Sequence, residues 1–226
     1  MAHYLRRDIC KGSKEEIQYK SSNTKKKEEA IIREINNPRY ISYDFETYQD
    51  VKNDNRHVPN LCRAQVIVVS DDHSVEKSFV GEQKVFPGDS CLKDFCDWLM
   101  LPENANSTVI AHNQAGYDGK FILSWFIKNC DVPDKYIQQG SRISYMYYRK
   151  NNIRFIDSLS FFLCPLSKLS ETFNIDTVKG YFPHKFNIPS NQTYVGKIPD
   201  ASYYGSYNMK ADDKVKFDKW YAENKI

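Results

Sequence analysis

Apolar and polar residues alternate strictly in the first regular segment of the chain, 40–46. A period of two residues predicts a β-strand with one apolar face. The apolar members are Ile41, Tyr43 and Phe45, and the polar members are Ser42, Asp44 and Glu46. Segments 63–69 and 75–80 are rich in β-branched residues and flank the polar residues 70–73, so they predict a β-hairpin.

Helical periodicity appears twice in the first half of the chain. Leu92, Phe95, Cys96 and Leu99 recur at i, i+3, i+4 and i+7, after a capping residue at Asp89 or Ser90 and before Pro102; this pattern predicts an amphipathic helix. A short strand is predicted over 108–112. It leads into a second helix over 116–129, with Phe121, Ile122, Trp125 and Phe126 on the side that packs on the sheet.

The second half of the chain predicts two more strands, 142–148 and 153–156, then a short helix over 165–173. Segment 180–207 is dense in Pro, Gly, Asn and aromatic residues and predicts an irregular, packed loop, and segment 212–225 predicts a final helix. The order strand, strand, strand, helix, strand, helix favours an α/β fold. We expect a mixed sheet of the ribonuclease H-like type, flanked by helices.

The charge is concentrated at the start of the chain. Residues 1–39 carry ten Lys or Arg and six Asp or Glu, whereas the whole chain has 32 and 29. We therefore expect a basic N-terminal tail or short helix over 1–39 and one main domain over 40–226. The tail either screens phosphates or is a solvated helix start, and both interpretations stay open.

Six cysteines form no C-x-x-C pair, and no apolar signal segment opens the chain. The apolar stretches are far shorter than the roughly 20 residues of a membrane span. These features predict a soluble, intracellular protein with reduced thiols and no membrane partner, without resolving nucleus, cytoplasm or organelle.

Two groups of residues carry candidate chemistry. Asp44 and Glu46 lie at i and i+2, so a strand directs both carboxylates to one face, about 7 Å apart, where Mg²⁺ or Mn²⁺ would relieve their repulsion. An ordinary solvent-facing strand has the same pattern. Asp118 falls in the first turn of a helix, where it would also complement the helix dipole. Asn113 and Tyr117 beside it are suited to hydrogen-bond a terminal nucleotide and to stack on a base.

The order of these residues resembles the exonuclease motifs of family B DNA polymerases. Asp-Phe-Glu-Thr at 44–47 is followed by His-Asn at 112–113, Tyr-Asp at 117–118 and Phe-Ile at 121–122. Asp157-Ser158-Leu159 resembles the (Ser/Thr)-Leu motif, and Lys179-Gly180-Tyr181-Phe182 the Lys-x-x-hydrophobic motif, of the protein-primed branch. That branch includes bacteriophage, linear-plasmid and self-synthesising transposon polymerases.

The resemblance implies 3′-to-5′ proofreading by phosphodiester hydrolysis with two Mg²⁺ or Mn²⁺ ions. Asp44, Glu46 and Asp118 would bind metal, and Lys179 would assist catalysis by stabilising charge on the phosphate. The 3′ end of single-stranded DNA would be held by Thr47, Asn113, Tyr117, Ser158 and Leu159.

One element of the family pattern is missing. The third exonuclease motif, Tyr-x-x-x-Asp, supplies the last metal ligand in the family, and no tyrosine at the end of this chain has an aspartate four residues later. We therefore expect an exonuclease-like domain truncated at its C-terminal end, without its polymerase domain, the partner in the longer protein. A second metal ion would then bind poorly. The alternatives are a non-catalytic relic that binds single-stranded DNA and a decaying fragment without function.

Overall fold

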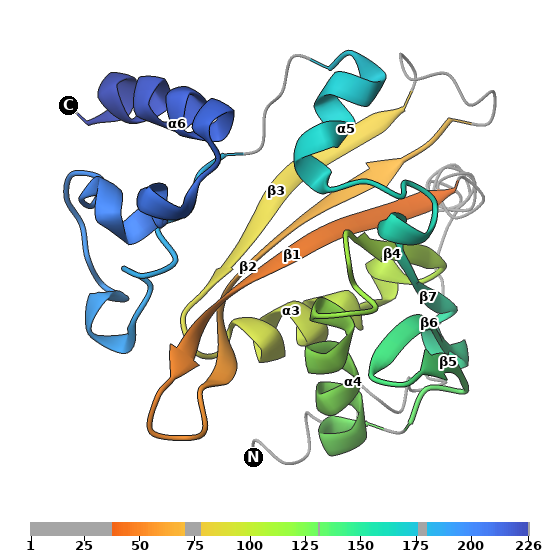
Figure 1. Cartoon of the computed structure of the whole chain (residues 1–226). Coiled ribbons are helices and arrows are strands. Elements are labelled where there is room, and N and C mark those ends of the chain that lie inside the picture. Colours follow the sequence, from red (N-terminus) through yellow and green to blue (C-terminus); the bar gives the residue numbers. More distant parts are fainter. Residues whose placement is uncertain (1–37, 71–77, 131, 176–179, 226) are drawn as a thin grey trace, which may run out of the picture. The chain divides into compact units, whose positions relative to one another are not determined.

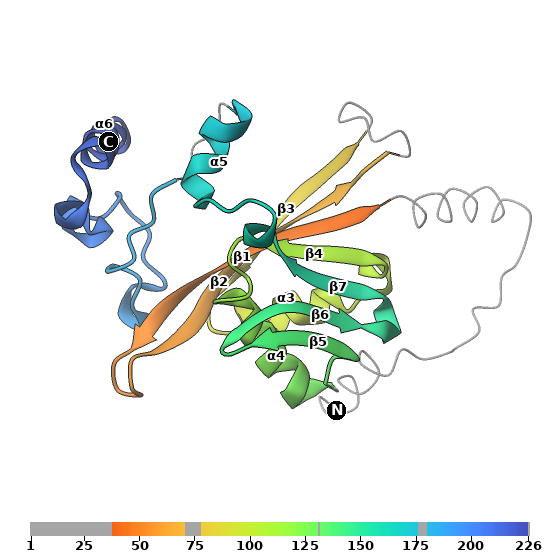
Figure 2. The same cartoon turned by 45° about the vertical axis from the view of Figure 1, so that its right-hand side comes forward.

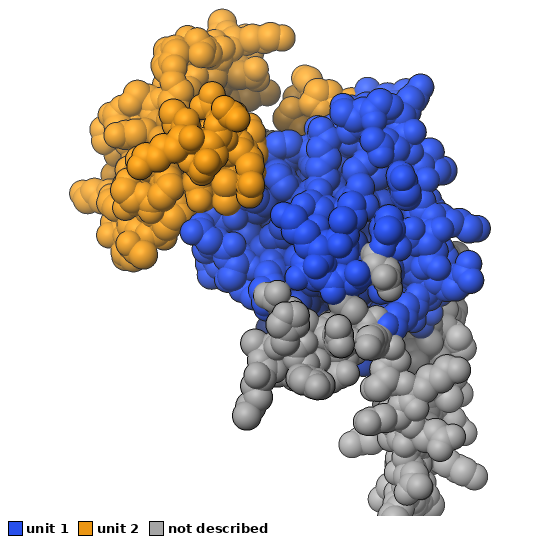
Figure 3. All heavy atoms as spheres, turned by 90° about the horizontal axis from the view of Figure 1, so that it is seen from below, with its two compact units in different colours: residues 1–46, 59–163 blue, residues 47–58, 164–226 orange. Residues whose placement is uncertain are grey.

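The structure is a computed structural model that describes residues 38–70, 78–130, 132–175 and 180–225. The expected basic tail lies almost wholly outside the described residues. The chain divides into two compact units, which Figure 3 shows in different colours. Among the described residues, the first unit contains 38–46 and 59–163, and the second contains 47–58 and 164–225.

The described part of the chain forms a seven-stranded sheet with the order β3-β2-β1-β4-β7-β6-β5 (Figure 1). Strand β1 pairs in parallel with β4, and β4 in parallel with β7, whereas β2 and β3, β5 and β6, and β6 and β7 are antiparallel. This is the mixed, ribonuclease H-like arrangement that the sequence predicts. The strands are β1 (Arg39–Asp50), β2 (Arg56–Val68), β3 (Phe79–Pro87), β4 (Ser107–Ala111), β5 (Lys135–Gln139), β6 (Arg142–Tyr148) and β7 (Ile153–Asp157).

The core of the first unit lies between the sheet and two helices, α3 (Cys91–Leu99) and α4 (Asp118–Asn129), which cover one face (Figures 1 and 2). Phe95 of α3 is fully buried, stacks on Tyr43 with ring centroids 5.1 Å apart and meets Phe45 edge-on at 5.6 Å. Each such buried side chain contributes about 1.5 to 3 kcal/mol. The apolar face of β1 that the sequence predicts is therefore the face that holds α3.

The predicted hairpin forms, but its second strand is shifted. Strand β3 starts at Phe79 and runs to Pro87, instead of 75–80, and residues 71–77 lie outside the described part. A register shift separates the pair Ile67–Val80 from the pair Gln65–Gln83. The Gly81 carbonyl next to this irregularity accepts a hydrogen bond from Gln65 Nε2 at 3.1 Å, so a side chain supports the strand where its pattern breaks.

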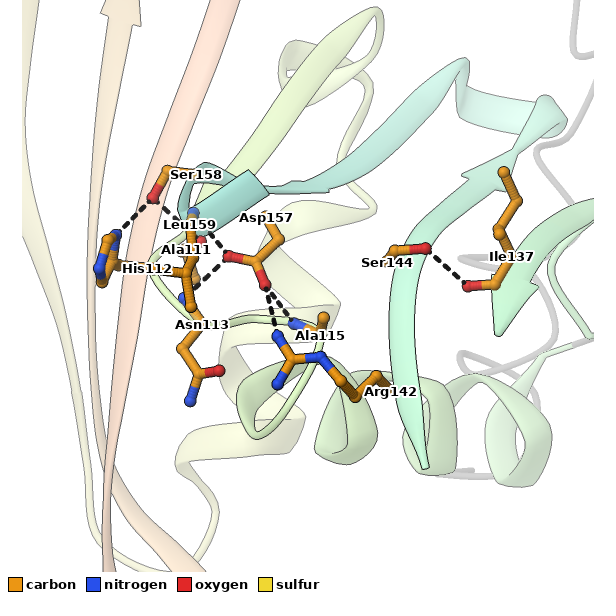
Figure 4. Close-up of polar contacts among 10 residues, drawn as sticks. All are labelled: Ala111, His112, Asn113, Ala115, Ile137, Arg142, Ser144, Asp157, Ser158 and Leu159. Atoms are coloured by element: carbon orange, nitrogen blue, oxygen red, sulfur yellow. Dashed lines mark hydrogen bonds and ion pairs between the residues drawn. The ribbon is translucent and has the colours of Figure 1, made fainter. Parts of the chain in front are cut away.

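Strand β5 is the element that the sequence pattern does not predict. All five of its residues are exposed, and they show no apolar alternation. Its main support is the antiparallel ladder with β6, which shifts register between Ile137 and Gln138. At that shift Ser144 Oγ donates to the Ile137 carbonyl at 3.2 Å (Figure 4).

The second unit contains α5 (Leu166–Phe173) and α6 (Ala211–Asn224), joined by an irregular segment as predicted. Phe217 of α6 is fully buried among aromatic rings, including Tyr181 at 5.1 Å and Tyr204 at 5.4 Å between centroids. Short 3-10 helices occur in both units: Pro102–Asn104, Arg149–Asn151, Ser158–Ser160, Pro189–Asn191, Ala201–Tyr204 and Ser206–Asn208.

No helix within the described ranges is long and apolar enough to cross a membrane. Four cysteines in these ranges are free thiols: Cys62, Cys91, Cys96 and Cys164.

Candidate functional site

Asp44 and Glu46 lie on the face of β1 opposite the core. Asp44 is exposed and Glu46 is half-buried, whereas their neighbours Tyr43 and Phe45 are buried at 5% and 4% exposure. The period of the strand thus separates the carboxylates from the apolar side chains, as the sequence predicts.

Asp118 is the first residue of α4, and its side chain is buried at 3% exposure. Its Oδ1 accepts a hydrogen bond from the Phe45 backbone N–H at 3.2 Å. The parallel ladder between β1 and β4 ends at the pair Ser42 and Ile110. Beyond that point the Asp118 carboxylate provides Phe45 with an acceptor, so the helix start is tied directly to the strand that carries Asp44 and Glu46.

The electrostatics of Asp118 link the three carboxylates. Burial raises the pKa of Asp118, the charge of Asp44 raises it further and Glu46 adds to the effect; the Phe45 N–H opposes them, and the resulting pKa is about 7. Like charges raise a carboxyl pKa only when they lie near it. Even so, no three His, Cys, Asp or Glu side chains in the described ranges are grouped as a ready metal site. The three carboxylates therefore share one region without forming a closed set of ligands.

The turn between β4 and α4 positions Asn113 and Tyr117. Asn113 has a left-handed backbone with φ of 69°, which asparagine tolerates better than most residues. Gln114 is fully buried, and its Oε1 accepts from the Tyr43 hydroxyl at 3.1 Å. A Cβ at Gly119 would lie 2.9 Å from the Gln114 carbonyl oxygen. The turn therefore requires a glycine after Asp118, which gives the Asp-Gly pair in the sequence a physical reason.

Asp157, at the end of β7, connects this turn to the next one (Figure 4). Its carboxylate is 1% exposed and accepts three backbone hydrogen bonds: Asn113 N–H to Oδ1 at 2.8 Å, Leu159 N–H to Oδ1 at 2.9 Å and Ala115 N–H to Oδ2 at 3.0 Å. The Arg142 guanidinium lies 3.9 Å from Oδ2. One buried carboxylate thus holds together the two turns that carry Asn113, Ser158 and Leu159.

Ser158 and Leu159 follow Asp157 in a single turn of 3-10 helix. The Ser158 Oγ lies 3.0 Å from His112 Nδ1 and 3.4 Å from the Ala111 carbonyl, to which it donates (Figure 4). Both side chains are half-buried. The structure therefore places Ser158 beside the residue that precedes Asn113.

Seven of the nine residues singled out from the sequence lie in the first unit, on β1, around the start of α4 and after β7. Thr47 belongs to the second unit, where its Oγ1 lies 3.1 Å from His57 Nδ1 and its carbonyl accepts from Asn187 Nδ2 at 3.0 Å. Lys179 lies outside the described residues.

Sequence reasoning missed the supporting roles of Asp157 and Gln114. Asp157 directly precedes Ser158, and an aspartate at a strand end is a common acceptor for backbone N–H groups of the following turn. That signal was available. Nothing in the sequence around Gln114 distinguishes a buried amide from an exposed one.

The chain is similar to known proteins along much of its length. The family described as "DNA polymerase type B, organellar and viral" matches residues 99–226. A DNA polymerase of Kluyveromyces lactis is 29% identical over 157 residues, which are 64% of this chain and 15% of that protein. A probable DNA polymerase of Ascobolus immersus is 33% identical over 141 residues, 56% of this chain and 11% of that protein. The chain thus spans only a small part of the curated relatives it matches.

Two kinds of solved structure show partial similarity. The Phi29 DNA polymerase in complex with primer-template DNA and incoming nucleotides has a TM-score of 0.48 and 20% identity, over 74% of this chain and 28% of that one. A complex named ExoI/SSB-Ct has a TM-score of 0.34 and 12% identity, over 64% of this chain and 32% of that one.

Proposed function

Because the chain belongs to the organellar and viral type B DNA polymerases, we propose that it is their 3′-to-5′ exonuclease region and hydrolyses the terminal phosphodiester of single-stranded DNA. The observation that carries the proposal is that Asp44 and Glu46 lie near Asp118: burial of Asp118 and the charges of these two carboxylates together raise its pKa to about 7. Carboxylates that repel one another in this way favour divalent cations.

The donor set suits Mg²⁺ or Mn²⁺, because all three ligands are carboxylates and hard cations prefer oxygen. Asp44 and Glu46 would hold the ions from β1, and Asp118 from α4. When bound, two such ions activate a water and stabilise the leaving 3′ oxygen. The ligands are not grouped as a closed site in the described residues, so we expect ions and DNA phosphate to complete the arrangement together.

The remaining residues would hold the DNA. Asn113 offers an amide from a turn fixed by Asp157, and Tyr117 offers a half-buried ring supported edge-on by Phe121, with centroids 5.2 Å apart. Tyr117 would stack on a base, whatever its identity. Ser158 and Leu159 would contact the strand from the neighbouring turn. Thr47 and Lys179 keep the roles that the family resemblance implies: DNA contact and stabilisation of phosphate charge.

A binding function without cleavage is the second candidate. It is favoured by the same observation that no closed group of metal-binding side chains exists in the described ranges. In that case the turns around Asn113 and Ser158 would bind a 3′ end that the chain does not cut. In either case the polymerase part of a longer protein would be the natural partner.

The two candidates are separated by a cleavage assay. Purified chain is incubated with a 3′-labelled single strand and Mg²⁺ or Mn²⁺, alongside Asp44→Asn, which removes one metal ligand but keeps the shape of the side chain. We expect the chain to release labelled mononucleotide and the variant to lose that activity. Asp89→Asn, an exposed aspartate before α3, is the matched control and should cleave normally. Equal cleavage by Asp44→Asn and the unaltered chain would rule out the exonuclease.

A further inference from the structure

A groove of about 470 Å³ runs between α4 and the β5–β6 hairpin, in the first unit. We propose that it binds single-stranded DNA upstream of the nucleotides at the 3′ end that the residues near Asp118 hold, so that the chain holds a longer single strand than those residues alone would hold. The inference rests on the proposed function, because it extends the path of the same DNA. The groove itself is a separate surface, since Asp118 and Lys120, two residues apart, project from nearly opposite sides of the helix.

The α4 side of the groove has the spacing of a strand-binding surface. Lys120, Ser124 and Lys128 line it and follow one another at four-residue intervals. With a rise of 1.5 Å per residue, the two lysines are about 12 Å apart along the helix. Stacked nucleotides are spaced about 3.4 Å apart along one strand, so this length matches about three of them.

The composition of the groove is complementary to single-stranded DNA. None of the described residues that line it is acidic, and Lys120 and Lys128, the first and last of its α4 residues, are exposed. Neither lysine forms an ion pair with any residue in the described ranges. Between them the lining includes Leu123, Ile127 and Ile143. Proteins that bind single strands without sequence preference combine two features: ammonium groups that neutralise phosphates, and a surface between them on which the bases pack.

The groove is joined to the candidate site by β6. The Ile143 N–H donates to the Ala115 carbonyl at 2.9 Å, so the wall of the groove is bonded to the turn that carries Asn113. Arg142, next along β6, reaches the same turn: a Cβ at Gly116 would lie 2.7 Å from Asn113 Oδ1 and 3.3 Å from Arg142 Nη1. A strand that leaves Asn113 would therefore meet the Arg142 guanidinium before it reaches the groove.

The proposal is tested by binding as a function of DNA length. Fluorescence anisotropy in EDTA, which prevents cleavage, measures the affinity of the full chain for 5′-labelled oligothymidylates of three and ten nucleotides. The double variant Lys120→Ala/Lys128→Ala should bind the ten-nucleotide strand on the order of tenfold more weakly and the three-nucleotide strand unchanged. The slope of log affinity against log salt for the longer strand should fall by about 1.4, for two phosphate contacts.

Two controls separate the possible outcomes. Lys84→Ala/Lys93→Ala removes two exposed lysines from β3 and α3 and should leave both affinities near those of the unaltered chain. Tyr117→Ala should weaken binding of both lengths. If the Lys120/Lys128 variant binds the ten-nucleotide strand as tightly as the Lys84/Lys93 variant, or loses affinity equally for both lengths, the groove proposal is overturned while the proposed function stands. If the unaltered chain binds neither strand, the groove proposal fails, and the cleavage assay with metal ions decides the proposed function.

Discussion

Asp118→Asn should raise the free energy of unfolding by on the order of 3 to 4 kcal/mol at pH 8 in a buffer without divalent cations. The reason is that the folded protein holds this side chain where burial and the charges of Asp44 and Glu46 disfavour ionisation, with a pKa of about 7 against an ordinary 3.8. Asparagine has the same shape and keeps an oxygen for the Phe45 N–H, but it carries no charge.

The effect should depend on pH in a defined direction. Below pH 4 Asp118 is protonated in both the folded and the unfolded chain, so the variant should be only slightly more stable than the unaltered chain. Between pH 4 and 7 the unfolded chain loses this proton and the folded chain keeps it, so the stability of the unaltered chain falls with rising pH. Above pH 7 the side chain is ionised in both states and the difference is constant. The difference in the free energy of unfolding between the variant and the unaltered chain should therefore grow from pH 4 to pH 7 and then level off.

Urea denaturation of both proteins at pH 4.5, 6 and 8 measures this difference. Repeating the series with Mg²⁺ should stabilise the unaltered chain and leave Asp118→Asn nearly unaffected, because bound cations relieve the repulsion only where the carboxylate is present. A gain that is the same at all three pH values would contradict the assignment of Asp118 as a buried, strained carboxylate.

Asp157→Ala should lower the free energy of unfolding by about 3 to 5 kcal/mol. The alanine leaves the N–H groups of Asn113, Ala115 and Leu159 without their acceptor, and each unsatisfied buried donor costs about 1 to 3 kcal/mol. Asn113 and Leu159 are half-buried, so water can partly satisfy their N–H groups. The total cost of the three unsatisfied groups therefore stays below three times the maximum for one group.

Hydrogen exchange locates the effect, because the amides of these three residues should exchange faster in the variant while those of α3 stay protected. Asp134→Ala is the matched control: this exposed aspartate also accepts a backbone N–H, from Arg149 at 2.8 Å, and pairs with its side chain, but at the surface. It should cost less than about 1 kcal/mol. If the two substitutions lower the free energy of unfolding equally, Asp157 does not organise the two turns.

The elements that the sequence predicted well are those with a buried face. The alternation around Tyr43 and the helical spacing of Phe95 reflect contacts with the core, so the pattern appears in the sequence itself. The distal halves of β1 and β2 were not predicted. They extend to Asp50 and from Arg56 around a polar turn in which Asp54 and Asn55 have positive φ, and none of the residues nearest the turn, 47–50 and 56–58, is buried.

The candidate site shows the same division. Placement of Asp44 and Glu46 on one strand face, and of Asp118 at the start of a helix, follows from local periodicity and was predicted. The raised pKa of Asp118 depends in part on Asp44 and Glu46, more than 70 positions away in the chain. Two of the three hydrogen bonds of Asp157 come from residues more than 40 positions away. Such long-range contacts leave no pattern in a local window, which is why this part of the support emerged only from the structure.

The hydrogen bond between Asn187 and the Thr47 carbonyl joins positions 140 residues apart. Chains are synthesised at about 5 to 20 residues per second, so Thr47 is synthesised about 7 to 28 s before its partner. The strands of the first unit are complete by residue 157. During synthesis, therefore, all strands of the sheet exist before Asn187, the residue that binds the Thr47 carbonyl near the tip of the β1–β2 hairpin.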